Sequence, residues 1–277
     1  MLSRNAHATL PPGFDELILA PRQSMKTTTL ALSLCLAIVP LVSAQAQESD
    51  RPNCTGLPTA TKLKSDLKNL DGVPLTIGGA GGQIGGFFNG TRVWVAVVNR
   101  SGQACAVATS SDETTQVWPG SQAMAKAKAH TANSFSNDAL AFSTAKLYTI
   151  AQPGHSLWNH EQSNSFDTQQ IGVPADAGNS KGRLAGDFIF LGGGVPLYDV
   201  LGRVIGGLGV SGDTSCADHE VAKRIRQLSN LNPAGGATAD DISYSKPDGA
   251  SAFTHPQCVA TYRNGKFIGD EAAAKGY

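Results

Sequence analysis

The segment "GRVIGGLGVSG", residues 202–212, decides the fold. Its glycines can belong either to a dinucleotide-binding loop or to a central β-strand, and the two explanations predict different folds. Gly207, Gly209 and Gly212 have the G-x-G-x-x-G spacing of a dinucleotide cradle, which requires an acidic residue about 20 positions later, at the end of a second strand. The corresponding region, "NLNPAGGATADD" at residues 230–241, contains no apolar run that predicts a strand. We therefore interpret the segment as a central strand whose glycines mark the close approach of another backbone or of a ligand.

Two β-hairpins are predicted, and the segment above is the second strand of one of them. Its partner lies in "GDFIFLGGGVPLYD", residues 186–199, with a turn at residues 200–202. The other hairpin joins "RVWVAVVN", residues 92–99, to "QACAVATS", residues 103–110, through the short turn "RSG". Two further short strands are predicted in "CVATYRNGKFIG", residues 258–269, around the turn signal Asn264-Gly265.

Helical patterns occupy residues 57–72, 119–135, 138–151 and 214–231. In the first of these, Leu63, Leu67 and Leu70 share one face, and Pro119 suits the start of the second. The order of elements is helix, hairpin, helices, hairpin, helix. It predicts an α+β fold with a mainly antiparallel sheet, because a doubly wound fold would alternate single strands with single helices.

The composition is that of a neutral protein. The chain has 277 residues, with 22 basic and 22 acidic side chains, and its length suits one ordinary domain with extensions. Nothing in this balance indicates nucleic-acid binding, since the densest basic cluster, "KRIR" at residues 223–226, lies within a helical pattern.

An export signal is predicted at residues 25–46. Lys26 precedes an apolar run from Leu30 to Val42, and Ala44-Gln45-Ala46 has the small-residue pattern of a cleavage site. The run is too short for a permanent anchor, so we expect a periplasmic or secreted protein with no membrane segment after cleavage. Residues 1–24 have no targeting pattern of their own and are interpreted as a non-native upstream extension, with a longer signal as the alternative.

Export gives the cysteines a structural role. After the loss of Cys35, four remain, namely Cys54, Cys105, Cys216 and Cys258, an even number that predicts two disulfides in an oxidising compartment. Neighbouring cysteines are more than 40 positions apart, which disfavours a zinc site.

Five blocks of the chain resemble the GlcG/HbpS-like haem-binding family: "VWVAVVNRSGQACAVATS", "KAKAHTA", "GGGVPL", "GRVIGGLGVSG" and "ADHEVA". The resemblance covers residues 57–231 and implies a single profilin-like domain, residues 54–231, with helices packed on an antiparallel five-stranded sheet. It also implies homo-oligomers and a small-molecule ligand, haem or iron. The haem would be non-covalent, because C-x-x-C-H is absent. Insertions at about residues 76–91 and 155–183, and a C-terminal extension, residues 232–277, depart from the family pattern.

The extension suggests how the cysteines pair. A Cys216–Cys258 bridge would attach the extension to the domain, and a Cys54–Cys105 bridge would tie down the N-terminal segment. We favour this pairing among the three connectivities that four cysteines allow.

The resemblance also suggests ligand-binding residues in the block "KAKAHTA". His130 falls at the variable position of the family pattern, where an imidazole would be an axial haem ligand; the alternative is an exposed histidine on an Ala-rich helix. Lys128 and Thr131 match the pattern itself. They would hold a propionate by charge and by a hydroxyl hydrogen bond, or serve local packing.

Other candidates lie outside this block. The backbone of Gly192, Gly193, Gly194 and Pro196 would cradle a carboxylate or propionate; the alternative is a bulged strand end. His155 and His160 would bind iron if their loop folds over the site. Asp218 is explained by capping of the last helix.

Two functions are therefore open. The first is an exported haem- or iron-binding protein, with a slow haem-degrading or redox-stress-related role. The second is an accessory or small-organic-acid-processing enzyme of a periplasmic oxidation pathway, with the glycine-rich backbone as its anion site. No catalytic residue is identified, and a serine hydrolase would need the G-x-S-x-G elbow that the chain lacks.

Overall fold

The structure is a computed structural model in which residues 53–70, 73, 82–160 and 188–273 are described. The predicted signal at residues 25–46, the upstream residues 1–24 and most of the insertion at 155–183 lie outside these ranges. The chain divides into two units, Met1–Ala44 and Gln45–Tyr277, and every described residue belongs to the second.

The main sheet is antiparallel and has the strand order β3-β2-β5-β4. Its strands are β2 (Trp94–Asn99), β3 (Ala104–Thr109), β4 (Gly194–Tyr198) and β5 (Val204–Ser211), so both predicted main hairpins are present. Among the described residues this sheet has four strands, and the expected fifth strand is not found there. The glycine-rich strand β1 (Gln83–Gly85) pairs instead with β8 (Thr261–Gly269) of the C-terminal extension.

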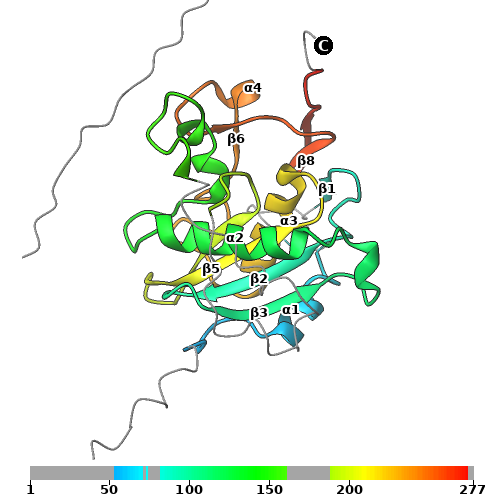
Figure 1. Ribbon diagram of the computed structural model, residues 1–277, viewed down its shortest axis with the longest axis vertical. Helices are drawn as coiled ribbons and strands as arrows, with labels where there is room; N and C mark the ends of the chain where they lie inside the picture. The colour runs from blue at the N-terminus through cyan, green and yellow to red at the C-terminus, as the bar shows by residue number, and fades with distance from the viewer. Residues whose placement is uncertain (1–52, 71–72, 74–81, 161–187, 274–277) are drawn as a thin grey trace, which may run out of the picture. The chain divides into compact units, whose positions relative to one another are not determined.

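Helices cover both faces of the sheet (Figure 1). The helices are α1 (Ala60–Asp66), α2 (Ser121–Phe135) and α3 (Ser215–Leu228). Alternate residues of β2 divide between two clusters: Val95 and Val97 pack with α1 and α3, whereas Trp94 and Ala96 pack with α2. This arrangement explains why every residue of β2 is buried.

The glycines of β5 let α2 lie directly on the strand. A Cβ atom on Gly209 would stand 2.0 Å from the carbonyl oxygen of Ala125, and one on Gly207 would stand 2.2 Å from that of Ala129. Both distances are far below a van der Waals contact, so only glycine fits at these positions. The interpretation of the opening segment as a strand approached by another backbone is confirmed.

Residues 138–151 do not form the predicted helix. They contain two short 3-10 turns, η2 (Thr144–Leu147) and η3 (Thr149–Ala151). The Asn137 side chain accepts the backbone N–H groups of Ala139 and Leu140, a local turn that competes with helix initiation. Ser143 then donates to the carbonyl oxygen of Asp240, which ties this segment to the C-terminal extension.

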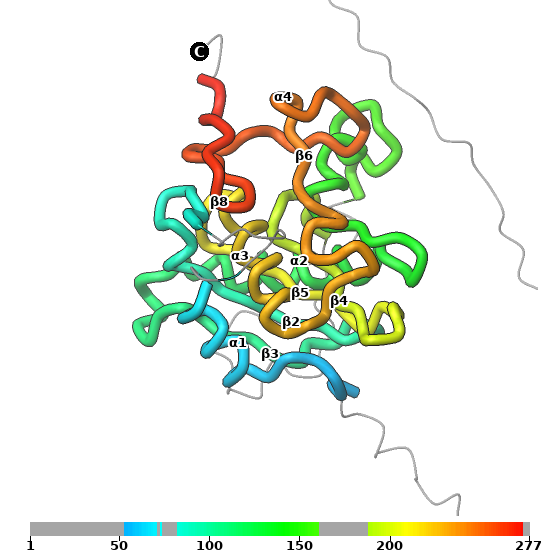
Figure 2. Tube along the Cα trace, turned by 180° about the vertical axis from the view of Figure 1, so that it is seen from behind, coloured from blue at the N-terminus to red at the C-terminus, as the bar shows by residue number. Residues whose placement is uncertain are grey.

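The C-terminal extension covers the polar side of α3, and Figure 2 shows it beside that helix. Arg226 pairs with Asp240 and Lys223 with Asp241, each at 2.5 Å, with all four side chains mostly buried. The predicted turn at Asn264-Gly265 is instead part of one strand, β8; Asn264 and Gly265 have left-handed φ values of 53° and 79°. The remaining elements are small and join these parts: η1 (Thr114–Gln116), β6 (Ser243–Tyr244), α4 (Ser245–Asp248) and β7 (Thr254–His255).

Two disulfides tie the outer segments to the domain. The structure contains Cys54–Cys105 and Cys216–Cys258, the pairs that the positions of the cysteines favour. The second bridge joins the start of α3 to the C-terminal extension. In the part of the chain that the structure describes, no helix has the length and apolar character needed to span a bilayer.

Candidate functional site

His130 lies near the end of α2 and is partly buried. Its ring stacks on that of Phe188, with the ring centres 5.4 Å apart and the planes inclined by 11°. The Nδ1 atom is buried and has no hydrogen-bond partner among the described residues. Burial lowers the pKa of His130, which favours the neutral imidazole, the form that binds metal ions.

An aromatic cluster lies beside this imidazole. It consists of Phe135, Phe188 and Phe190, and Phe188 makes its contact with His130. The rings of Phe135 and Phe188 meet edge to face at 5.4 Å, and Phe188 stacks near Phe190 at 6.2 Å. Further apolar side chains pack against the cluster from the segment after α2: Phe142, Leu147, Ile150, Ala151 and Leu157. The surroundings of His130 are therefore apolar and aromatic on the side of Phe188.

The hydroxyl group of Thr131 makes two hydrogen bonds within the protein. The hydroxyl donates to the carbonyl oxygen of Ala127 at 2.7 Å and accepts the backbone N–H of Ile189 at 3.0 Å. The side chain is fully buried. The propionate contact suggested for Thr131 is therefore not available, and the residue anchors the segment that carries Phe188 and Phe190.

Lys128 is also engaged. Its ammonium group donates to Asp218 Oδ2 at 2.8 Å, and each side chain is only 2% exposed. Burial raises the pKa of Asp218 to about 6, although Lys128 acts in the opposite direction. The N-cap of α3 is Thr214, which accepts from the N–H of Ala217. Asp218, in the first turn, accepts the N–H of Asp213 through Oδ1 at 3.0 Å, so it supports the start of the helix and is also a buried ion-pair partner.

The glycine run is packed against this ion pair. A Cβ atom on Gly193 would stand 2.9 Å from both Lys128 Nζ and the Asp218 Cβ. The N–H of Gly192 donates to His255 Nε2 at 3.2 Å, and that of Gly194 donates to Thr144 Oγ1 at 2.8 Å. Neither N–H group is free for a carboxylate, so the expected cradle is not formed by these two residues.

Pro196 contributes its carbonyl oxygen to a protein contact as well, because Arg226 donates to it at 3.2 Å. Three blocks that carry the family resemblance, those of Lys128, Gly193 and Asp218, thus meet in the interior. Their joint role in this structure is packing around a buried charge pair.

His155 and His160 are exposed, and neither belongs to a group of metal-capable side chains with His130. Within the described ranges one such group exists, formed by Cys216, His255 and Cys258, and its two cysteines are joined in a disulfide. The sequence did not single out His255 as a buried residue beside the glycine run. Burial lowers the pKa of His255 to about 4. Its contact with Gly192 spans 63 positions, which no local pattern could reveal.

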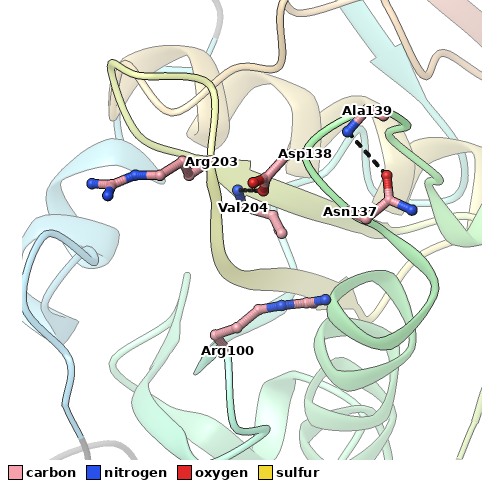
Figure 3. Close-up of a pocket in the computed structure, with 6 residues that line it drawn as sticks. All are labelled: Arg100, Asn137, Asp138, Ala139, Arg203 and Val204. Atoms are coloured by element: carbon pink, nitrogen blue, oxygen red, sulfur yellow. Dashed lines mark hydrogen bonds between the residues drawn. The ribbon is translucent and has the colours of Figure 1, made fainter.

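A separate open pocket of about 660 Å³ lies at the end of α2 (Figure 3). Its polar groups serve the protein: Arg100 donates to the carbonyl oxygens of Asn133 and Ser136, and Asp138 accepts the N–H of Val204. None of the ligand-binding residues predicted from the sequence lines this pocket. The pocket lining comprises Arg100, Asn137, Asp138, Ala139, Arg203 and Val204.

The antiparallel sheet and the helices that cover it define an α+β domain, and a partly buried imidazole lies beside aromatic rings on its second helix. The chain matches the family described as haem degrading protein HbpS-like over residues 88–227. This match spans half of the chain, and the protein belongs to that family.

Similar solved structures share 19–22% of their residues with this chain. A DUF336 protein of Klebsiella pneumoniae, ORFY, is 22% identical with a TM-score of 0.40 over 62% of this chain and 87% of its own. The PduOC:heme complex is 20% identical, also with a TM-score of 0.40, over 62% of this chain and 92% of its own. A double mutant of HbpS from Streptomyces reticuli is 19% identical with a TM-score of 0.38, over 70% of this chain and 97% of its own. No curated protein matches the chain.

Proposed function

We propose that this protein binds haem non-covalently and that His130 is an axial ligand of the iron. The observation that carries the proposal is the His130 imidazole, which stacks on Phe188 and whose Nδ1 has no hydrogen-bond partner among the described residues. Burial lowers its pKa and so favours the neutral form. Membership of a family described by haem degradation supports the choice of ligand, as does the haem named for one similar protein.

The residues present fit such a group. Phe188 and Phe135, which are partly exposed, would provide apolar contact to the porphyrin, while His130, whose pKa burial lowers, would supply a nitrogen to the iron. Bound haem would supply a redox-active iron, and a slow haem-degrading or redox-stress role belongs to this proposal. Haem is favoured over free iron because a bare ion needs several protein ligands, and no described histidine, cysteine or carboxylate forms a metal-capable group with His130.

Lys128 is not the partner of the propionates in this proposal, because its charge is satisfied by Asp218. The alternative function, small-organic-acid processing at the glycine run, has less support. The N–H groups of Gly192 and Gly194 already serve His255 and Thr144.

We further propose export to the periplasm or beyond. The signal pattern at residues 25–46 and the two disulfides support it. A homo-oligomer also stays a proposal that rests on the family resemblance. The small residues of α2 do not add to it, because Ala125 and Ala129 are buried against the sheet of the same chain.

A haemin titration of the purified, oxidised protein tests the ligand. We expect a Soret band at micromolar haemin and a rise in melting temperature. Ligand at 100 times its Kd should stabilise the fold by ~2.7 kcal/mol. No Soret band, together with a rise in melting temperature on adding a small carboxylate such as glycolate, would reject haem in favour of the alternative.

A further inference from the structure

Thr131 follows the proposed iron ligand directly in the chain, and its hydroxyl group joins α2 to the segment at Phe188. The oxygen donates to Ala127 and accepts from the N–H of Ile189, and the side chain has no exposed surface. An oxygen held by two protein groups in a fully buried position cannot reach a ligand.

The residues on either side of Ile189 build the wall of the site. Phe188 stacks on the His130 ring, and Phe190 meets Phe135 edge to face at 5.7 Å. The hydrogen bond from the Ile189 N–H to the Thr131 hydroxyl therefore attaches the segment of residues 188–190 to α2. Ile189 is adjacent in the chain to Phe188, whose ring stacks on the imidazole of His130.

We propose that Thr131 is a positioning residue, which acts through Ile189 to hold Phe188 against His130 and so sets the orientation in which the imidazole meets its ligand. The effect on haem rests on the proposed function, whereas the effect on the imidazole does not. Loss of the hydroxyl leaves the Ile189 N–H without its acceptor and weakens the attachment of this segment to α2.

The first test uses the protein without haem. The carbon-bound protons of a stacked imidazole resonate upfield because of the ring current of Phe188. In Thr131→Val, which keeps the shape and removes the acceptor, this displacement should shrink. Thr131→Ser keeps the acceptor and should preserve it. Unchanged His130 resonances in Thr131→Val would overturn the proposal, whether or not the protein binds haem.

The second test adds haemin. Thr131→Val should retain the histidine-ligated spectrum of the wild type but bind about tenfold more weakly, while Thr131→Ser binds as the wild type does. Thr149→Val is the matched control, because it removes a partly buried hydroxyl bond to the carbonyl oxygen of Thr254 and leaves the bond between Thr131 and Ile189 in place. A Thr131→Val spectrum without histidine ligation would instead identify Thr131 as the ligand and refute the positioning role.

Discussion

Replacing Gly209 by alanine should destabilise the protein severely. The new Cβ would stand 2.0 Å from the carbonyl oxygen of Ala125 and 2.4 Å from the backbone nitrogen of Ala129, where an ordinary contact begins at 3.4 Å. Both obstacles are helix backbone, which cannot rotate away, so α2 must retreat as a whole by more than an ångström. Overpacking of a core costs ~1–3 kcal/mol and more where nothing can yield.

We therefore expect Gly209→Ala to lower the free energy of unfolding by ~3 kcal/mol or more, the upper end of that range. For a domain of about 200 residues, this corresponds to a fall of about 6–12 °C in Tm. Circular dichroism during thermal and urea unfolding of the oxidised protein measures both quantities.

Gly120→Ala is the matched control. Gly120 precedes α2, has a φ of −62°, and a Cβ there meets nothing within 4 Å. Its effect should stay within ~1 kcal/mol, the scale of a changed helix cap. If Gly209→Ala were as stable as Gly120→Ala, α2 would not rest on β5 as described, and the explanation of the glycine spacing would be refuted.

The remaining predictions concern the buried ion pair and the extension. Burial raises the pKa of Asp218 from 3.8 to about 6, so its ionisation removes stability as the pH rises through this window. The unfolding free energy of Asp218→Asn relative to the wild type should therefore improve by ~2 kcal/mol between pH 4 and pH 7, because one unit of pKa shift corresponds to about 1.36 kcal/mol. A pH-independent difference in urea titrations would contradict this. Replacing Cys216 and Cys258 together by serine should cost ~4 kcal/mol by the loop-entropy relation, and a peptide joining Cys54 to Cys258 in unreduced digests would disprove the pairing.

The elements with strong local patterns could be predicted from the sequence. The hairpins of β2 with β3 and of β4 with β5 follow from apolar runs around short turns, and the Ala-rich and amphipathic patterns gave α2 and α3. Residues 138–151 could not be read this way. There, a side chain of the turn at Asn137 and contacts with the distant extension override helix propensity.

The candidate site was only partly accessible to sequence reasoning. His130 stood out by its position in a motif, but its environment depends on Phe188, which lies 58 positions later in the chain. Lys128 looked like a free cation because its partner, Asp218, is 90 positions away. Charges that pair across the fold cannot be told from ligand-binding charges until the fold is known.

The most direct test of the account is a haemin titration of three proteins in parallel: the wild type, His130→Ala and His155→Ala. His155 is an exposed histidine outside any metal-capable group among the described residues, so its variant controls for surface binding. We predict a saturable Soret band of the same shape for the wild type and His155→Ala, and a lost or shifted band for His130→Ala. A His130→Ala titration that matches the wild type in affinity and spectrum would contradict the central claim that His130 binds the haem iron.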